Sequence, residues 1–100
     1  MRKARLLIID DDENIRKMLQ TNLEDEGYPA EIEDTAKKGI ERIEKAFYNF
    51  ALIDVHLPDM DDIEFLSELR NTKPKTRKIT ITGYLTLQNT LSAVNKGADA

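Results

Sequence analysis

The sequence predicts an α/β fold in which a parallel β-sheet carries helices on both faces. The chain has 100 residues, which suits a single domain. Short apolar runs, which are typical of buried strands, alternate with segments whose apolar residues recur at helical spacing. The resulting order is β-α-β-α-β-α-β-α, and strands that alternate with helices form parallel sheets through right-handed crossovers.

The first strand and the first helix are predicted from the apolar run Leu6–Ile9 and from the amphipathic segment that follows it. Four consecutive large apolar residues are expected of a strand that is covered on both faces. The helix should end near Gly27, because glycine is common just beyond helix C-termini. Its inward side is predicted to comprise Ile15, Met18, Leu19 and Leu23.

The second strand is predicted at Ala30–Glu33, where apolar and acidic residues alternate as expected of an exposed edge strand. Asp34 or Thr35 can cap the next helix, because both side chains can accept hydrogen bonds from the amides of a helix N-terminus. The inward side of that helix is predicted to comprise Ala36, Ile40, Ile43 and Phe47.

The second half of the chain repeats this pattern. The third strand is predicted at Phe50–Val55, which is apolar except for Asp54, and the fourth follows from Ile79 and Ile81, which alternate with threonines. Apolar residues at helical spacing predict the last two helices. They are Ile63, Leu66 and Leu69 in the third helix and Leu87, Leu91, Val94 and Ala98 in the fourth.

Composition narrows the functions that this fold could have. The formal net charge is −4, which disfavours nucleic acid as a direct partner. No apolar run approaches the roughly 20 residues of a membrane span, and we expect neither membrane association nor a signal peptide. Cysteine is absent, which excludes disulfides and thiolate chemistry. A reducing cytoplasm is the expected location.

Acidic and hydroxyl residues follow three of the predicted strands. Asp10–Asp12 come after the first strand, Asp54 ends the third, and Thr82 ends the fourth. Ligands bind beyond the carboxyl ends of the strands in such sheets, so we expect these residues to converge there. Carboxylates held close together repel each other strongly unless a cation lies among them. Ligands that are all oxygen atoms favour a hard ion such as Mg²⁺.

Asp54 is the candidate nucleophile. It follows the apolar run Ala51–Ile53, where a charge is costly unless it has a partner or a function. A carboxylate can attack phosphorus and form an aspartyl phosphate. This reaction requires a positioned oxygen and neutralisation of the phosphoryl charge. Mg²⁺ can supply much of that neutralisation, and the hydroxyl of Thr82 can donate a hydrogen bond to a phosphoryl oxygen.

Three segments resemble the receiver domains of two-component response regulators in their order and spacing. They are Ile9–Arg16, Ile53–Asp61 and Ile79–Tyr84, and the tail Ala93–Asp99 resembles the end of that family's fourth helix. The resemblance covers essentially the whole chain, residues 1–100. It implies a flavodoxin-like, doubly wound parallel sheet of strand order 2-1-3-4. The family continues into a fifth strand bearing a lysine and a fifth helix, so we expect this domain to be incomplete at its C-terminus.

The resemblance also implies a role for each candidate residue. Asp11 would bind Mg²⁺ directly and Asp10 through water, while Asp54 would be both a metal ligand and the phosphoacceptor. His56 would bind the metal through its backbone carbonyl, and Thr82 would be the switch hydroxyl. A sensor histidine kinase or a phosphotransfer protein would supply the phosphoryl group to Asp54, and the effector that responds would be of unknown type. The domain would be regulatory rather than an enzyme, assisting only its own phosphorylation and dephosphorylation.

Two other functions stay open. A pseudo-receiver that binds partners without phosphate is favoured by the absence of the lysine and disfavoured by the intact acidic residues. An aspartate-nucleophile phosphatase usually has a second aspartate two residues after the first, where this chain has His56. Without the fifth strand and helix, one sheet face and the edge of the fourth strand would be uncovered, which favours a dimer through either surface.

Several acidic residues also have purely structural interpretations. Asp12 is expected to cap a helix rather than to bind a metal. A calcium loop that begins at Asp59 is disfavoured, because it lacks the required glycine and its last position is Arg70 instead of glutamate. Asp59 and Asp62 stand where the family often has glycine, and aspartate tolerates unusual backbone angles better than most residues do.

Overall fold

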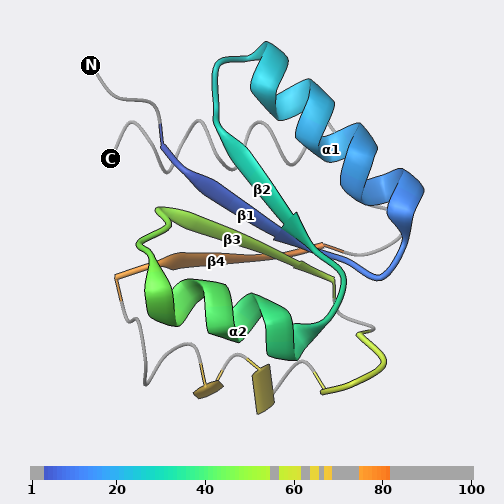
Figure 1. Ribbon diagram of the computed structural model, residues 1–100, viewed down its shortest axis with the longest axis vertical. Coiled ribbons are helices and arrows are strands. Elements are labelled where there is room, and N and C mark those ends of the chain that lie inside the picture. Colours follow the sequence, from blue (N-terminus) through green and yellow to red (C-terminus); the bar gives the residue numbers. More distant parts are fainter. Residues whose placement is uncertain (1–3, 55–56, 62–63, 66, 69–74, 82–100) are drawn as a thin grey trace.

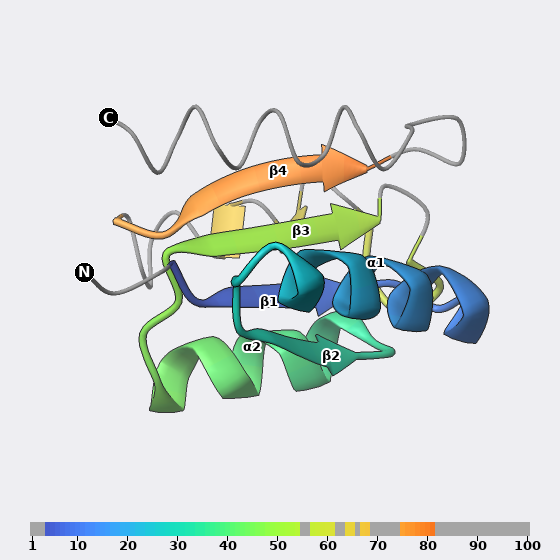
Figure 2. The ribbon, with the colours of Figure 1, turned by 90° about the horizontal axis from the view of Figure 1, so that it is seen from above.

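The computed structural model describes residues 4–54, 57–61, 64–65, 67–68 and 75–81. Four strands form one sheet of order β2-β1-β3-β4, and each neighbouring pair is parallel (Figures 1 and 2). This confirms the predicted α/β class, the parallel sheet and the strand order 2-1-3-4. The elements are β1 (Leu6–Ile9), α1 (Glu13–Asp25), β2 (Ala30–Glu33), α2 (Ala36–Lys45), β3 (Phe50–Asp54) and β4 (Arg77–Ile81).

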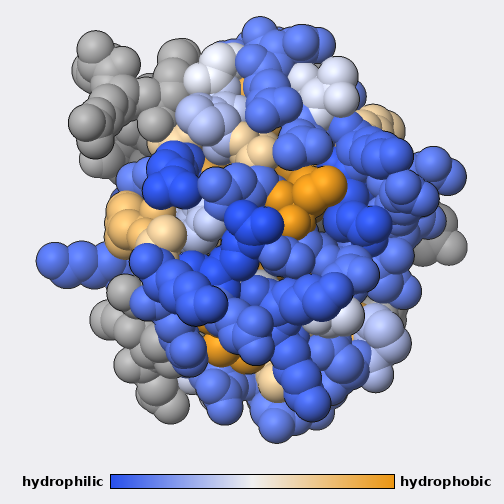
Figure 3. Space-filling model, in the orientation of Figure 1, coloured by the Kyte–Doolittle hydropathy of each residue, from blue (hydrophilic) through white to orange (hydrophobic). Residues whose placement is uncertain are grey.

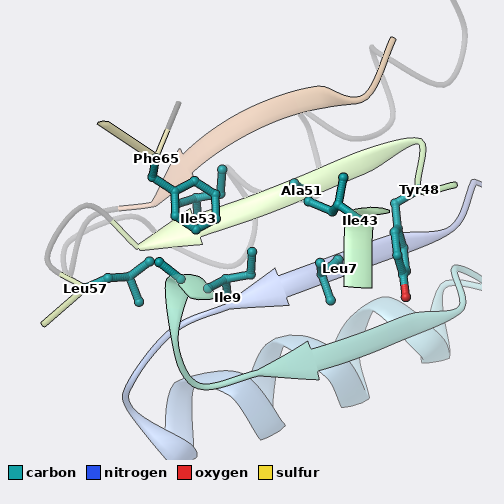
Figure 4. Close-up of a cluster of buried hydrophobic side chains, with 9 residues drawn as sticks. Leu7, Ile9, Ile43, Tyr48, Ala51, Ile53, Leu57 and Phe65 are labelled. Atoms are coloured by element: carbon teal, nitrogen blue, oxygen red, sulfur yellow. The ribbon is translucent and has the colours of Figure 1, made fainter. Parts of the chain in front are cut away.

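The two long helices cover opposite faces of the sheet. Successive strand residues point to opposite faces, so Leu6 and Ile8 of β1 pack with α1, whereas Leu7 and Ile9 pack with α2. All four of these side chains are fully buried, as the continuous apolar run predicts for a central strand. Figure 1 shows the sheet between α1 and α2. Figure 4 shows the cluster under α2, in which Ile9, Ile53, Leu57 and Phe65 lie at one end and Tyr48 at the other.

Helix α2 approaches β1 closely because it carries a glycine where the two elements meet. A Cβ atom added to Gly39 would lie 2.9 Å from Cγ1 of Ile9 and closer still to its Cδ1. Thr35 caps the helix by accepting a hydrogen bond from the amide of Lys38 (3.2 Å), which decides between the two predicted caps. At the end of α1, Gly27 has a φ of 91°, as expected of a glycine that terminates a helix.

Two of the predicted core positions are wrong. Met18 is 46% exposed and Phe47 is 49% exposed. The buried residues of α1 are Leu19 and Leu23, and Met18 lies about 100° around the helix from Leu19, at the edge of that stripe.

Helix α2 ends at Lys45, and the next residue, Ala46, has extended angles (φ −146°, ψ 155°). Phe47 therefore leaves the helical phase, and Tyr48 takes the buried position instead, with 2% of its surface exposed.

The third helix is described only in part, and its predicted inward positions are not among the described residues. Glu64, Phe65, Ser67 and Glu68 are helical, and Phe65 is fully buried. Sequence periodicity missed Phe65, while the predicted positions Ile63, Leu66 and Leu69 lie outside the described residues, as do Val55 and the whole predicted fourth helix.

Exposed apolar residues do not gather into one surface on the face that Figure 3 displays. That face is hydrophilic over most of its area, with separate hydrophobic spots among the described residues. Within the described part of the chain, no helix is long and apolar enough to cross a membrane.

Candidate functional site

The carboxyl ends of β1 and β3 place two acidic residues side by side. The strands are adjacent and parallel, and Ile9 is paired with Ile53 in their register. The next residues along the two strands are Asp10 and Asp54. Their proximity therefore follows from strand order and register, and it could not be derived from the spacing of the two residues in the sequence.

Asp11 joins these two residues to form a cluster of three carboxylates. One carboxylate oxygen from each of Asp10, Asp11 and Asp54 lies within 4.8 Å of the others. Asp10 is buried, Asp54 is half-buried and Asp11 is exposed. The cluster thus extends from the end of the core to the solvent, and its donors are all oxygen atoms, the ligands that Mg²⁺ prefers.

Asp10 is the residue whose ionisation is most disturbed. Burial raises its pKa from 3.8 to about 6, against the opposing effect of the Asp12 amide, and the negative charges of Asp54, Asp11 and Asp12 raise it further. The Asp12 amide donates to Oδ1 of Asp10 (2.9 Å). A buried carboxylate beside other carboxylates favours protonation or a bound cation, since either one removes the repulsion.

The loop from β1 to α1 is fixed by hydrogen bonds at the first turn of the helix. Oδ1 of Asp12 accepts from the amides of Asn14 (2.9 Å) and Ile15 (3.1 Å). This confirms the predicted cap and explains why Asp12 does not join the cluster. Nη1 of Arg16 donates to the carbonyl of Asp10 (2.8 Å). The sequence did not predict this hydrogen bond of Arg16, because a side chain that binds a backbone carbonyl six residues away leaves no recognisable sequence pattern.

Two acidic residues that follow β3 bind helix N-termini. Oδ1 of Asp61 accepts from the amide of Glu64 (2.9 Å) at the start of the third helix. Asp59 accepts from the amides of Ala36 (2.9 Å) and Lys37 (3.0 Å) at the start of α2. These contacts agree with the rejection of a calcium loop. Among the described residues other than glycine, none has a positive φ, so Asp59 adopts no glycine-like angle.

Two of the predicted site residues lie outside the described part of the chain. They are His56, whose carbonyl was expected to bind the metal, and Thr82, the expected switch hydroxyl. Asp10, Asp11 and Asp54 are brought together as the sequence predicted.

Comparisons with known proteins agree with this geometry. Residues 6–100 match the model of the response regulator receiver domain family. The transcriptional regulatory protein YkoG of Bacillus subtilis, itself uncharacterised, is 32% identical over 99 residues, which are 99% of this chain and 43% of that protein. The chain spans half or less of the first three curated relatives, at 43%, 20% and 50% of their lengths.

Solved structures show the same similarity. The CheY-like receiver domain protein of Methanospirillum hungatei JF-1 is 44% identical, with a TM-score of 0.78 over 98% of this chain and 78% of that one. The beryllofluoride-activated NtrC4 receiver domain dimer is 31% identical, with a TM-score of 0.75 over 96% of this chain and 79% of that one. With its parallel sheet, its acidic cluster and a family match over nearly its full length, this chain belongs to the response regulator receiver domains of two-component signalling.

Proposed function

We propose that this chain is a phosphoacceptor switch, in which Asp54 accepts a phosphoryl group from a histidine kinase or a phosphotransfer protein. The observation that carries the proposal is the convergence of three carboxylates at the carboxyl edge of the sheet, with the half-buried Asp54 at the end of β3. A carboxylate in this position is held by the strand and is accessible from the solvent side, as a nucleophile must be.

The cluster fits Mg²⁺. Asp11 and Asp54 would hold the ion directly and Asp10 would act through water, with the backbone carbonyl of His56 as a further ligand by family resemblance. When bound, Mg²⁺ supplies positive charge that neutralises the carboxylates and the incoming phosphoryl oxygens. Support comes from the raised pKa of Asp10, whose surroundings disfavour a third uncompensated negative charge.

The aspartates and Thr82 would each have a distinct role in the phosphoryl transfer. A carboxylate oxygen of Asp54 attacks phosphorus, the phosphorus–nitrogen bond of phosphohistidine breaks, and the imidazole leaves with a proton. Asp10 and Asp11 would repel the phosphoryl group if they were uncompensated, so phosphorylation should depend on the cation. The hydroxyl of Thr82 would then donate a hydrogen bond to a phosphoryl oxygen. This bond would couple the new charge to a change of conformation.

The remaining parts of the proposal concern the whole protein. We expect it to act in the cytoplasm, away from membranes, with no direct nucleic-acid contact by this domain and with an effector that the chain does not identify. The similarity to the beryllofluoride-activated NtrC4 receiver domain dimer supports a dimer of this domain.

The test is phosphorylation by a small-molecule donor. The chain is incubated with acetyl phosphate and MgCl₂ and its intact mass is measured, in parallel with Asp54→Asn and with a sample in a metal chelator. We expect one phosphoryl group on the wild type and none on either control. Addition of phosphate to Asp54→Asn would place the acceptor elsewhere. If the wild type stays unmodified and Mg²⁺ does not change its melting temperature, the phosphate-independent pseudo-receiver is favoured.

A further inference from the structure

The loop after β3 is joined to α2 by the carboxylate of Asp59. Asp59 lies five residues beyond Asp54, and its two oxygens bind the amides of Ala36 (2.9 Å) and Lys37 (3.0 Å). Thr35 takes the amide of Lys38 (3.2 Å). The first three amides of α2, which no helical carbonyl can reach, are therefore satisfied by one local residue and one residue from a distant loop.

The contact lies at the same edge of the sheet as the candidate site. In the sheet, β1 lies between β2 and β3. The loop after β3 and the connection from β2 to α2 both leave the carboxyl edge of the parallel sheet, where Asp10 and Asp11 also lie. The ends of β1 and β2 are also joined, because the amide of Asp10 donates to the carbonyl of Glu33 (3.2 Å).

The same loop has apolar anchors on either side of Asp59. Leu57 is buried, with 7% of its surface exposed, and Met60 packs against the cluster that contains Ile9 and Ile53. Figure 4 shows Leu57 at the end of this cluster where Ile9 and Ile53 lie. Leu57 is three residues beyond Asp54, and Asp59 is five residues beyond it, so both contacts are made close to Asp54 along the chain.

We propose that Asp59 is a positioning residue for the carboxylate cluster: by binding the N-terminus of α2 it fixes the β3 loop and so holds Asp54 in the geometry that binds a divalent cation. The proposal rests on the proposed function of that cluster. Groups that orient metal ligands from outside the ligand set affect metal affinity strongly. The pKa of Asp59 is lowered even though partial burial acts to raise it, because the two amides stabilise the carboxylate. The Asp59 carboxylate is therefore ionised at neutral pH.

A matched pair of variants separates positioning from ordinary helix capping. Asp59→Ala and Thr35→Ala both remove hydrogen bonds from the N-terminus of α2, but only Asp59→Ala releases the loop after β3. MgCl₂ is titrated calorimetrically into the wild type, both variants, Asp59→Asn and Asp54→Asn, and the melting temperature of each is recorded. We expect Asp59→Ala to weaken Mg²⁺ binding about tenfold, and Thr35→Ala to lower the melting temperature while leaving Mg²⁺ affinity unchanged.

Asp59→Asn tests whether a conservative substitution restores part of the Mg²⁺ affinity. It also keeps the proposal testable if Asp59→Ala does not fold. Its amide oxygen can still accept one of the two hydrogen bonds, so its Mg²⁺ affinity should lie between those of the wild type and Asp59→Ala. The proposal is overturned if the Asp59 variants bind Mg²⁺ as tightly as Thr35→Ala does. Failure of the proposed function would give a different result, in which the wild type binds no Mg²⁺ or Asp54→Asn binds it equally well. That result would overturn both the proposed function and the positioning role of Asp59.

Discussion

Individual aspartates serve two different purposes at the carboxyl edge of the sheet. Asp12 and Asp61 accept hydrogen bonds from amides in the first turn of the helices that follow them. Asp10 and Asp54 instead lie beside each other with Asp11. The difference is one of position relative to a helix start, because a carboxylate that can reach free amides is stabilised there. Negative charge is concentrated instead where Asp10, Asp11 and Asp54 come together.

The buried Asp10 should make the cation-free protein less stable as the pH rises. Its pKa of about 6 in the folded chain exceeds the 3.8 of an unperturbed carboxyl, so the folded state holds the proton more tightly. The stability that this provides is complete below pH 4 and is lost as the pH rises through 6. We expect Asp10→Asn to be more stable than the wild type at pH 7.5, by at most roughly 3 kcal/mol, and to lose this advantage at pH 4.

Urea denaturation in a metal chelator at both pH values measures this difference. Asparagine keeps the oxygen that accepts from the Asp12 amide, so the substitution removes the charge without removing the hydrogen bond. Asp11→Asn, which changes an exposed carboxylate of the same cluster, is the control and should give the smaller effect. A stability difference between Asp10→Asn and the wild type that does not vary with pH would contradict a raised pKa of Asp10 in the folded chain.

At the scale of elements, β2 is an edge strand protected by charged side chains. Glu31 forms ion pairs with Arg5 (3.0 Å) and Arg42 (3.0 Å), and it accepts a hydrogen bond from the hydroxyl of Tyr48. Arg42 also pairs with Glu33. Charges along an edge discourage pairing with another chain, and these pairs tie the edge to α2 without placing an apolar surface in the solvent.

The close approach of α2 to β1 should make Gly39 intolerant of a larger residue. Alanine is the better helix former by about 1 kcal/mol, but its Cβ would press against Ile9 at less than normal contact distance. Overpacking of a core costs about 1–3 kcal/mol, so Gly39→Ala should be destabilising by roughly 1 kcal/mol. Adding Ile9→Val, which deletes the nearest methyl group, should recover stability relative to Gly39→Ala in a double-mutant cycle by chemical denaturation. Strictly additive effects would rule out the contact.

For the whole molecule, the sequence predicted what depends on strong local patterns. Apolar runs and helical spacing located the described strands and the first two helices, and family resemblance supplied the strand order. The sequence prediction failed after α2, which ends at Lys45 without a following glycine, so Phe47 was predicted to be buried in place of Tyr48. It also missed the contact of Asp59 with α2, because a bond between residues more than 20 positions apart depends on the finished fold.

The two apolar clusters on opposite faces of the sheet should unfold as one unit. They share the central strands, since Leu52 faces the cluster under α1 and Ile53 faces the cluster under α2. Loss of either cluster would leave one side of β3 bare, which a small domain with only about 5–15 kcal/mol of stability cannot sustain. Leu52→Ala and Ile53→Ala should therefore each lower the free energy of unfolding of the whole chain by about 2–5 kcal/mol.

Tyrosine provides a probe on each face, because Tyr28 belongs to the first cluster and Tyr48 to the second. Their ring resonances, assigned with Tyr→Phe variants, can be followed by nuclear magnetic resonance during urea denaturation alongside far-ultraviolet circular dichroism. A shared core requires that both rings and the backbone lose their folded signals at the same urea concentration, in the wild type and in both core variants. If Leu52→Ala shifted the midpoint of Tyr28 and left that of Tyr48 in place, each face would have its own stability. The sheet would then fail to couple the clusters that position Asp54 from its two sides.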